Sequence, residues 1–225
     1  MTQLLQASTI SLDRLEAVAH LQEVETLAFF PEWQLDPPNL TDWERESLDR
    51  IRVGYFNLLR KPPLLENAVR MAVLYPLLFV AGFYLNPFQA RPEQSVTIAL
   101  EDEAGVRIEG RADVLVFKEN LWLMAIESKQ AQISLEAGIA QLLTYMLGAT
   151  QGDSPQTVPV FGLLTNGSHF LFAKLGPVQR TGTQGAEASI QYALSDEFVL
   201  RRQQNELYTV LGILKQLAIA IARKG

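Results

Sequence analysis

Residues 109–129, EGRADVLVFKENLWLMAIESK, contain two apolar runs joined by a short charged segment. The runs at 108–117 and 121–127 have the length and composition of β-strands, and the short segment between them favours an antiparallel pair. Because side chains alternate between the two faces of a strand, Glu127 and Lys129 point the same way. The second run is apolar on both faces until its last residues, which predicts a central strand with a polar end.

The pairing of these two strands decides where Asp113 lies. If residues 119–121 form a three-residue loop, Asp113 pairs directly with Glu127, and the two Cβ atoms lie about 4.5–5.5 Å apart. A two-residue turn would shift the register by one and place Asp113 on the opposite face. Two carboxylates this close repel each other unless a cation lies between them, and hard oxygen ligands suit Mg²⁺ or Mn²⁺.

Apolar periodicity and turn signals extend the prediction to the rest of the chain. Helices are expected to start at caps such as Ser11 and the Thr41–Glu44 capping box, and Asn166-Gly167 predicts a hairpin. The expected helices are 11–29, 41–61, 64–84, 134–148 and 197–223. The expected strands are 95–100, 108–117, 121–127, 158–164, 169–174 and 189–194. This order predicts an α/β (α+β) fold, with a mixed central sheet flanked by helices. Residues 1–62 are expected to form a helical N-terminal extension packed on a core at 63–225.

Composition excludes several classes of site. The 225 residues are 48% hydrophobic and 20% charged, which is typical of a globular chain. The absence of cysteine excludes disulfides, thiolate zinc sites and cysteine nucleophiles, and it suits a cytoplasmic protein. The two histidines, His20 and His169, are too far apart in sequence to favour a histidine-rich metal site. The apolar stretch 68–85 contains Arg70 and Pro76, so a buried helix is favoured over a membrane span.

The acidic pair and its lysine resemble the PD-(D/E)XK nuclease superfamily, which has a restriction-endonuclease-like core. The resemblance rests on Asp113, thirteen intervening residues, and then Glu127-Ser128-Lys129, and it covers about residues 65–174. Gln141 and Tyr145, which share one helix face, are similar to the Q-x-x-x-Y element of RecB-type nucleases. Residues 164–170, LTNGSHF, are similar to a hairpin in the N-terminal nuclease domains of type I restriction subunits. The family's proline before the first aspartate is replaced by Ala112.

The resemblance implies a nuclease that depends on Mg²⁺ or Mn²⁺ and hydrolyses DNA, most directly as an endonuclease. It implies catalytic roles for Asp113, Glu127, Lys129, Gln141 and Tyr145. It implies metal ligation by Asp113, Glu127, the backbone carbonyl of Ser128, and Glu66. Glu66 has a second explanation, because a helix dipole favours a glutamate in the first turn. The resemblance also agrees with a homodimer or with a partner motor or recognition subunit.

Other functions stay open from the sequence. Glu127 and Lys129 can be read as an ordinary exposed ion pair at a strand end. The net charge of −6 weighs against a broadly basic nucleic-acid binder, and it favours a catalytically silent nuclease fold that acts as a nucleic-acid-binding or assembly module. A glycosidase also uses paired carboxylates, but no aromatic sugar platform is recognisable. Arg111 is interpreted equally well as a phosphate contact or as a partner of Glu109.

Overall fold

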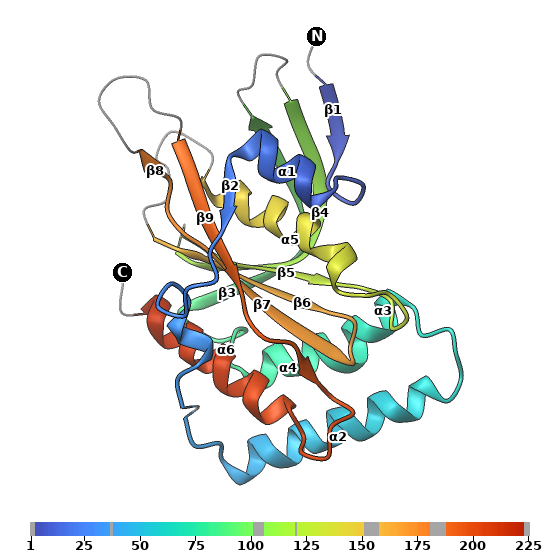
Figure 1. The fold of residues 1–225 in the computed structure, drawn as a ribbon. Helices are drawn as coiled ribbons and strands as arrows, with labels where there is room; N and C mark the ends of the chain where they lie inside the picture. Colours follow the sequence, from blue (N-terminus) through green and yellow to red (C-terminus); the bar gives the residue numbers. More distant parts are fainter. Residues whose placement is uncertain are drawn as a thin grey trace.

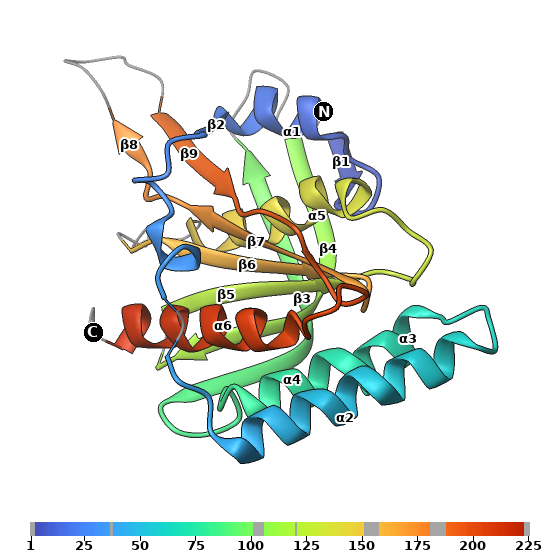
Figure 2. The same cartoon turned by 60° about the horizontal axis from the view of Figure 1, so that its bottom comes forward.

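The computed structural model describes residues 3–36, 38–100, 106–119, 121–150, 158–180 and 188–222. A mixed sheet is flanked by helices on both faces (Figures 1 and 2), as the sequence predicts. The strands are β1 (Gln3–Gln6), β2 (Leu21–Glu23), β3 (Phe88–Leu100), β4 (Val106–Lys118), β5 (Leu121–Ser128), β6 (Val160–Thr165), β7 (His169–Leu175), β8 (Gln179–Arg180), β9 (Ala188–Leu194) and β10 (Phe198–Val199). The sheet order is β1-β4-β5-β6-β7-β9-β2, with β3 beside β4, β10 beside β7 and β8 beside β9.

The helices divide between the two faces of this sheet. The helical elements are α1 (Leu12–Ala19), the 3-10 turn η1 (Pro31–Trp33), α2 (Asp42–Leu59), α3 (Glu66–Val69), the π-helix η2 (Arg70–Leu74), α4 (Tyr75–Val80), α5 (Glu136–Leu147), the 3-10 turn η3 (Gly148–Thr150) and α6 (Leu207–Ala222). One hydrophobic core joins α2, α4 and α6 to one sheet face, and a second joins α1 and α5 to the other. No helix among the described residues has both the length and the apolar character needed to cross a membrane.

A β-bulge sets the register between β4 and β5. Lys118 pairs with Leu121, so only two residues lie between the paired positions, and the expected three-residue loop is wrong. The register then shifts next to Val116, where Leu123 is an extra residue on β5, and beyond it Val114 pairs with Ile126. The bulge restores the register that the short turn would have lost. Asp113 therefore lies beside Glu127 because of the bulge, which the length of the turn alone does not predict.

The strand pairing changes from antiparallel to parallel between β5 and β6. These strands are parallel and are joined through α5, which lies over the sheet (Figure 1). All six residues of β6 are buried, as expected for a strand that is covered on both faces. This β5-α5-β6 unit places the helix residues Gln141 and Tyr145 against the face that carries Glu127.

The hairpin between β6 and β7 forms where Asn166-Gly167 predicts it. Asn166 Oδ1 accepts hydrogen bonds from the backbone N–H groups of Ser168 and His169, and Gly167 has a φ of +84°. The buried hydroxyl of Tyr55 on α2 bonds Asn166 O at 3.2 Å and Ser168 Oγ at 2.8 Å. The hairpin thus anchors α2 as well as joining two strands.

Replacing Gly167 with alanine is expected to lower the melting temperature by roughly 5–10 °C. The alanine would have to adopt a positive φ, which is strained for a residue with a Cβ. Its Cβ would also lie 2.5 Å from Tyr55 Cε2 in a buried position. Gly82→Ala is the matched control, because Gly82 has a φ of +83° with nothing within 4 Å of a Cβ. Thermal unfolding followed by circular dichroism compares the two variants. Equal losses would show that the contact with Tyr55 adds nothing to the backbone strain.

The N-terminal third is less helical than expected. Ser11 caps α1 as the sequence predicts, but the helix predicted over 11–29 ends at Ala19, where His20 adopts a left-handed conformation. Leu21 then pairs with Ile190 of β9 in parallel. Pairing with a sheet edge therefore overrides a helical spacing of apolar residues. Because β1 and β2 both belong to the central sheet, residues 1–62 are not a purely helical extension; the boundary at residue 62 itself stays a prediction.

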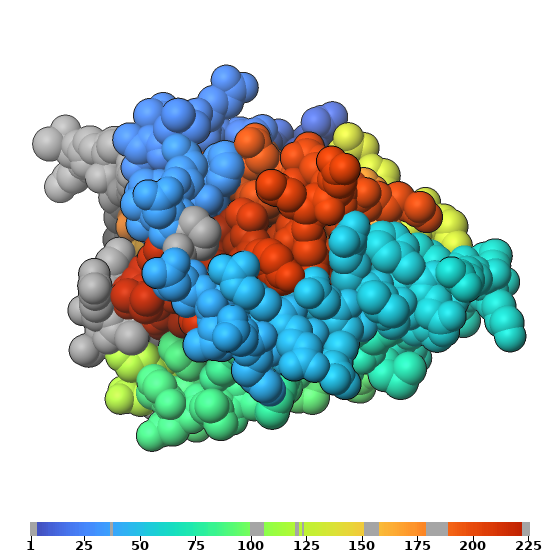
Figure 3. All heavy atoms as spheres, turned by 90° about the horizontal axis from the view of Figure 1, so that it is seen from below, coloured from blue at the N-terminus to red at the C-terminus, as the bar shows by residue number. Residues whose placement is uncertain are grey.

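The terminal helix also differs from its expected start. Phe198 and Val199 form β10 against β7, and α6 begins only at Leu207 rather than near residue 197. Asn205 Oδ1 caps the helix by accepting from the backbone N–H of Leu207 at 3.2 Å. The connecting segment is held by Arg52 of α2, which donates to the carbonyls at 200 and 202. Figure 3 shows α2 lying across this side, next to that segment.

Candidate active site

Asp113 and Glu127 lie side by side near one end of the β4-β5 pair. Asp113 is 6% exposed and Glu127 is 3% exposed, although both are carboxylates. Both line one pocket of about 290 Å³. The two strands therefore bring the sequence-predicted acidic pair to the same face.

Asp113 is held by the residue between the glutamate and the lysine. Its Oδ2 accepts a hydrogen bond from the Ser128 backbone N–H at 2.7 Å and another from the Ser128 hydroxyl. These two donors fix the rotation of the carboxylate, and its other oxygen, Oδ1, lies 3.2 Å from Arg70 Nη1. The predicted role of the Ser128 carbonyl as a metal ligand stays a prediction.

Lys129 connects the acidic pair to α5. Its ammonium donates to Glu127 Oε1 at 2.9 Å and also to Gln141 Oε1. The amide of Gln141 in turn donates to the Tyr145 hydroxyl at 2.7 Å. The helical spacing of Gln141 and Tyr145 therefore produces one polar chain from Glu127 to Tyr145. Two of the three ammonium donors are used in this chain, and the third can meet a substrate or water oxygen.

Burial controls the protonation of this cluster. Burial and the neighbouring Asp113 charge raise the pKa of Glu127 to about 8, while Lys129 opposes the rise. Burial also raises the pKa of Asp113, although the Ser128 hydrogen bonds and Arg70 oppose it. Burial and the Glu127 charge raise the pKa of Tyr145 to about 12, so its hydroxyl stays protonated at neutral pH. Tyr145 therefore orients Gln141 rather than acting as a base.

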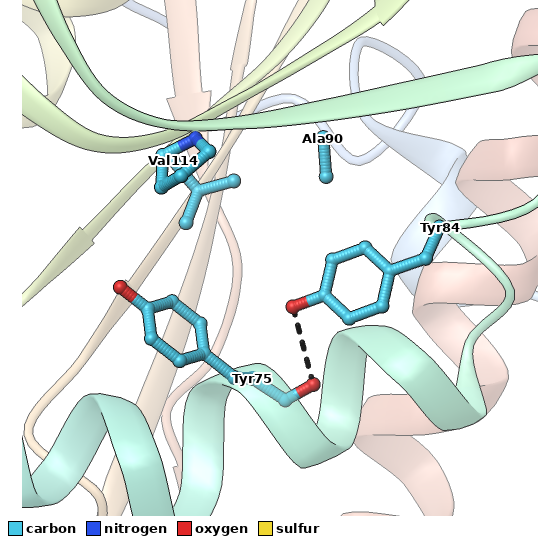
Figure 4. Close-up of a pocket in the computed structure, with 5 residues that line it drawn as sticks. Tyr75, Tyr84, Ala90 and Val114 are labelled. Atoms are coloured by element: carbon cyan, nitrogen blue, oxygen red, sulfur yellow. Dashed lines mark hydrogen bonds between the residues drawn. The ribbon is translucent and has the colours of Figure 1, made fainter.

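The pocket is strongly charged. Its ionisable lining consists of Glu66, Arg70, Glu93, Arg111, Asp113, Glu127 and Lys129. A second pocket, also about 290 Å³, lies between α4 and strands β3 and β4 (Figure 4) and is lined by Tyr75, Tyr84, Ala90, Pro92 and Val114. Its lining holds no carboxylate, lysine or arginine. Of these two pockets, the first is the one that offers the groups that metal-dependent hydrolysis needs.

The donor set of the charged pocket fits one small divalent cation. Glu127 Oε2 is buried without a hydrogen-bond partner among the described residues, and a cation is the partner that a buried carboxylate oxygen most needs. Asp113 and Glu127 supply two carboxylates, which is the number that Mg²⁺ commonly takes from a protein alongside water. Within the described residues, no three acidic or histidine side chains are grouped as a metal cage.

Glu66 reaches the same pocket but is engaged elsewhere. Its carboxylate forms an ion pair with Arg70, four residues later on the same helical segment. Arg70 Nη1 lies 3.2 Å from Asp113 Oδ1, so the guanidinium lies between the two carboxylates. The predicted role of Glu66 as a third carboxylate ligand would require Arg70 to move.

Arg70 and Glu93 belong to this site but were not singled out from the sequence. Glu93 occupies the β3 position opposite Asp113, has a φ of +53°, and accepts from Arg111 at 2.6 Å. Arg111 pairs with Glu93 rather than with Glu109. A signal for Arg70 was present, because an arginine inside an apolar helix requires a buried anion as partner. Glu93 has no such signal, because its place depends on strand pairing.

Comparison with known proteins gives a distant structural match. No protein-family model matches the chain, and a search of curated proteins finds no relative. One matching solved structure is a fragment described as an HsdR subunit of a type I restriction enzyme from Vibrio vulnificus YJ016. The TM-score is 0.36 and the identity 21%, over 48% of this chain and 20% of that chain. The match therefore spans about a fifth of the other chain's length.

Proposed function

We propose that the protein is a metal-dependent nuclease that cleaves phosphodiester bonds in DNA as an endonuclease. The observation that carries this proposal is the convergence of buried Asp113, buried Glu127 and Lys129 on one pocket. The exposed-ion-pair explanation of Glu127 and Lys129 is disfavoured, because Glu127 is buried and its second oxygen lacks a partner among the described residues.

Each side chain has a role that follows from its contacts. When bound, Mg²⁺ or Mn²⁺ supplies positive charge that stabilises the phosphate and makes a water molecule more acidic. Asp113 and Glu127 would hold the ion, and Ser128 keeps the Asp113 carboxylate in one orientation. Lys129 lines the pocket and keeps one N–H donor that would orient the attacking water or neutralise charge on the phosphate. Gln141 and Tyr145 hold Lys129 in that position.

Plasmid cleavage tests the proposal. Supercoiled DNA incubated with the protein and Mg²⁺ or Mn²⁺ should become nicked and then linear. EDTA should stop the reaction, and Asp113→Asn should slow it by at least about a hundredfold, because the amide keeps the shape but loses the charge that binds the cation. Asp49→Asn serves as the control, since Asp49 bonds Asn205 and Tyr208 away from the pocket.

The failures of this test are also informative. If the protein cleaves neither DNA nor RNA and binds no divalent cation, the nuclease proposal is wrong and a nuclease-fold binding module remains. If hydrolysis of a substrate continues in EDTA, the two carboxylates act without metal, as in a glycosidase.

A further inference from the structure

Arg70 has an unusual place for a cation next to a candidate metal site. Its side chain is 13% exposed and extends from the first residue of the π-helix. One guanidinium nitrogen lies 3.2 Å from Asp113 Oδ1 and 3.7 Å from Glu93 Oε1, and the other pairs with Glu66. A single guanidinium thus bridges three carboxylates.

Arg70 and a divalent ion would compete for the same oxygen. Asp113 Oδ2 already accepts two hydrogen bonds from Ser128, so Oδ1 is the oxygen that remains for a cation. A Mg²⁺ ion would lie about 2.0–2.1 Å from that oxygen. A guanidinium at 3.2 Å from the same atom would be in close like-charge contact with the ion. Arg70 and a divalent ion therefore cannot both contact Asp113 Oδ1 without strong electrostatic repulsion between them.

The charge balance of the pocket leads to the same conclusion. Its lining has four carboxylates, from Glu66, Glu93, Asp113 and Glu127, and three cations, from Arg70, Arg111 and Lys129. The formal sum is −1 with every group ionised. If Arg70 withdraws, the sum becomes −2, which matches one divalent ion. Because a guanidinium stays protonated in proteins, Arg70 must move rather than lose its proton.

We propose that Arg70 is a built-in competitor of the divalent cation, which must leave Asp113 and Glu66 before the ion can bind, and which therefore sets the metal affinity. The inference rests on the proposed nuclease function of the same pocket. It also explains how Glu66 becomes available as a ligand, since its present partner is Arg70.

Titration of Mn²⁺ alone, followed by calorimetry, tests this competition. Arg70→Gln is expected to bind Mn²⁺ at least about tenfold more tightly than wild type, because the competing charge is gone. Arg111→Gln is the matched control: it removes the same charge from the same pocket, but Arg111 contacts Glu93 and not Asp113. Its affinity should stay within about threefold of wild type. Equal effects of the two substitutions would overturn the proposal.

Two further measurements protect the test against misfolding of the variant. Arg70→Lys keeps the charge but has too short a head group to bridge Asp113 and Glu66 together, so its Mn²⁺ affinity should lie between those of wild type and Arg70→Gln. Mn²⁺ should also raise the melting temperature of Arg70→Gln more than that of wild type, because ligand binding stabilises the folded state. If the added Mn²⁺ stabilises both equally, Arg70 does not compete.

The outcome separates this inference from the nuclease proposal. Mn²⁺ binding by wild type that Asp113→Asn abolishes, with no gain in Arg70→Gln, overturns the role of Arg70 and leaves the nuclease proposal standing. If neither wild type nor Arg70→Gln binds Mn²⁺, both proposals fail.

Discussion

Lys129→Met should reduce single-turnover DNA cleavage by about 10²–10³-fold, the range seen when one preorganised donor is removed from an active site. Methionine has a similar length and can lie in the same space, but it cannot donate to Glu127, Gln141 or the substrate. The loss should therefore appear in the rate of the chemical step. The variant should still bind Mn²⁺, because Asp113 and Glu127 remain in place.

Lys215→Met is the matched control for this experiment. Lys215 also pairs with a carboxylate, Glu44, but it lies on α6 and not in the charged pocket. Its cleavage rate should equal that of wild type when both proteins are assayed in rapid-quench reactions with excess protein. A Lys129→Met protein that keeps more than a tenth of the wild-type rate would show that the ammonium takes no part in the chemistry.

Glu127→Gln should make the protein more heat-stable at high pH in the presence of EDTA. The pKa of Glu127 rises from 4.5 to about 8 on folding, so between these values the folded state keeps a proton that the unfolded state has lost. Stability must then fall as the pH rises through this window, and the full penalty is present above pH 8. Glutamine carries no ionisable group and escapes it. We expect a melting temperature roughly 5 °C or more above wild type at pH 9 and near equality at pH 5.

Thermal melts between pH 5 and pH 9 measure this difference. Glu46→Gln is the control, because Glu46 is exposed and pairs with Arg50 on the surface of α2, where such a pair contributes little. Adding Mn²⁺ should reverse the order at pH 9, since the ion stabilises the ionised wild type but not the amide. Parallel curves for wild type and Glu127→Gln in EDTA would contradict the buried, unfavourable charge that the site implies.

Sequence predicted the structure best where the local residue pattern agrees with the contacts that the segment makes in the fold. The β4-β5 pair was recognisable because both runs have the length and apolar composition of strands, and Gln141 and Tyr145 share a helix face that lies over it. The relation of Asp113 to Glu127 was the right prediction from an incorrect turn length. A bulge leaves no simple signal in residue type, because any apolar residue can be the extra one.

The elements that were missed depend on distant pairing. The edge strands β1, β2 and β10 are two to four residues long, which is too short for a period of two to be distinguished from a helical one. They form because β4, β9 and β7 present open edges to them. The identity of the three acidic partners of Arg70 was similarly hidden, because they lie on three separate elements.

The extra residue at Leu123 has a consequence for recognising relatives of this chain. Pairing is regular on both sides of it, with Phe117 opposite Trp122 and Val116 opposite Met124. A homologue that lacked only this residue would still bring its aspartate beside its glutamate, although twelve residues rather than thirteen would separate them. A homologue that lost a residue after the bulge would show the same spacing with the acidic pair split between two faces. The position of a gap relative to the bulge, rather than the spacing itself, is therefore the criterion for aligning such sequences.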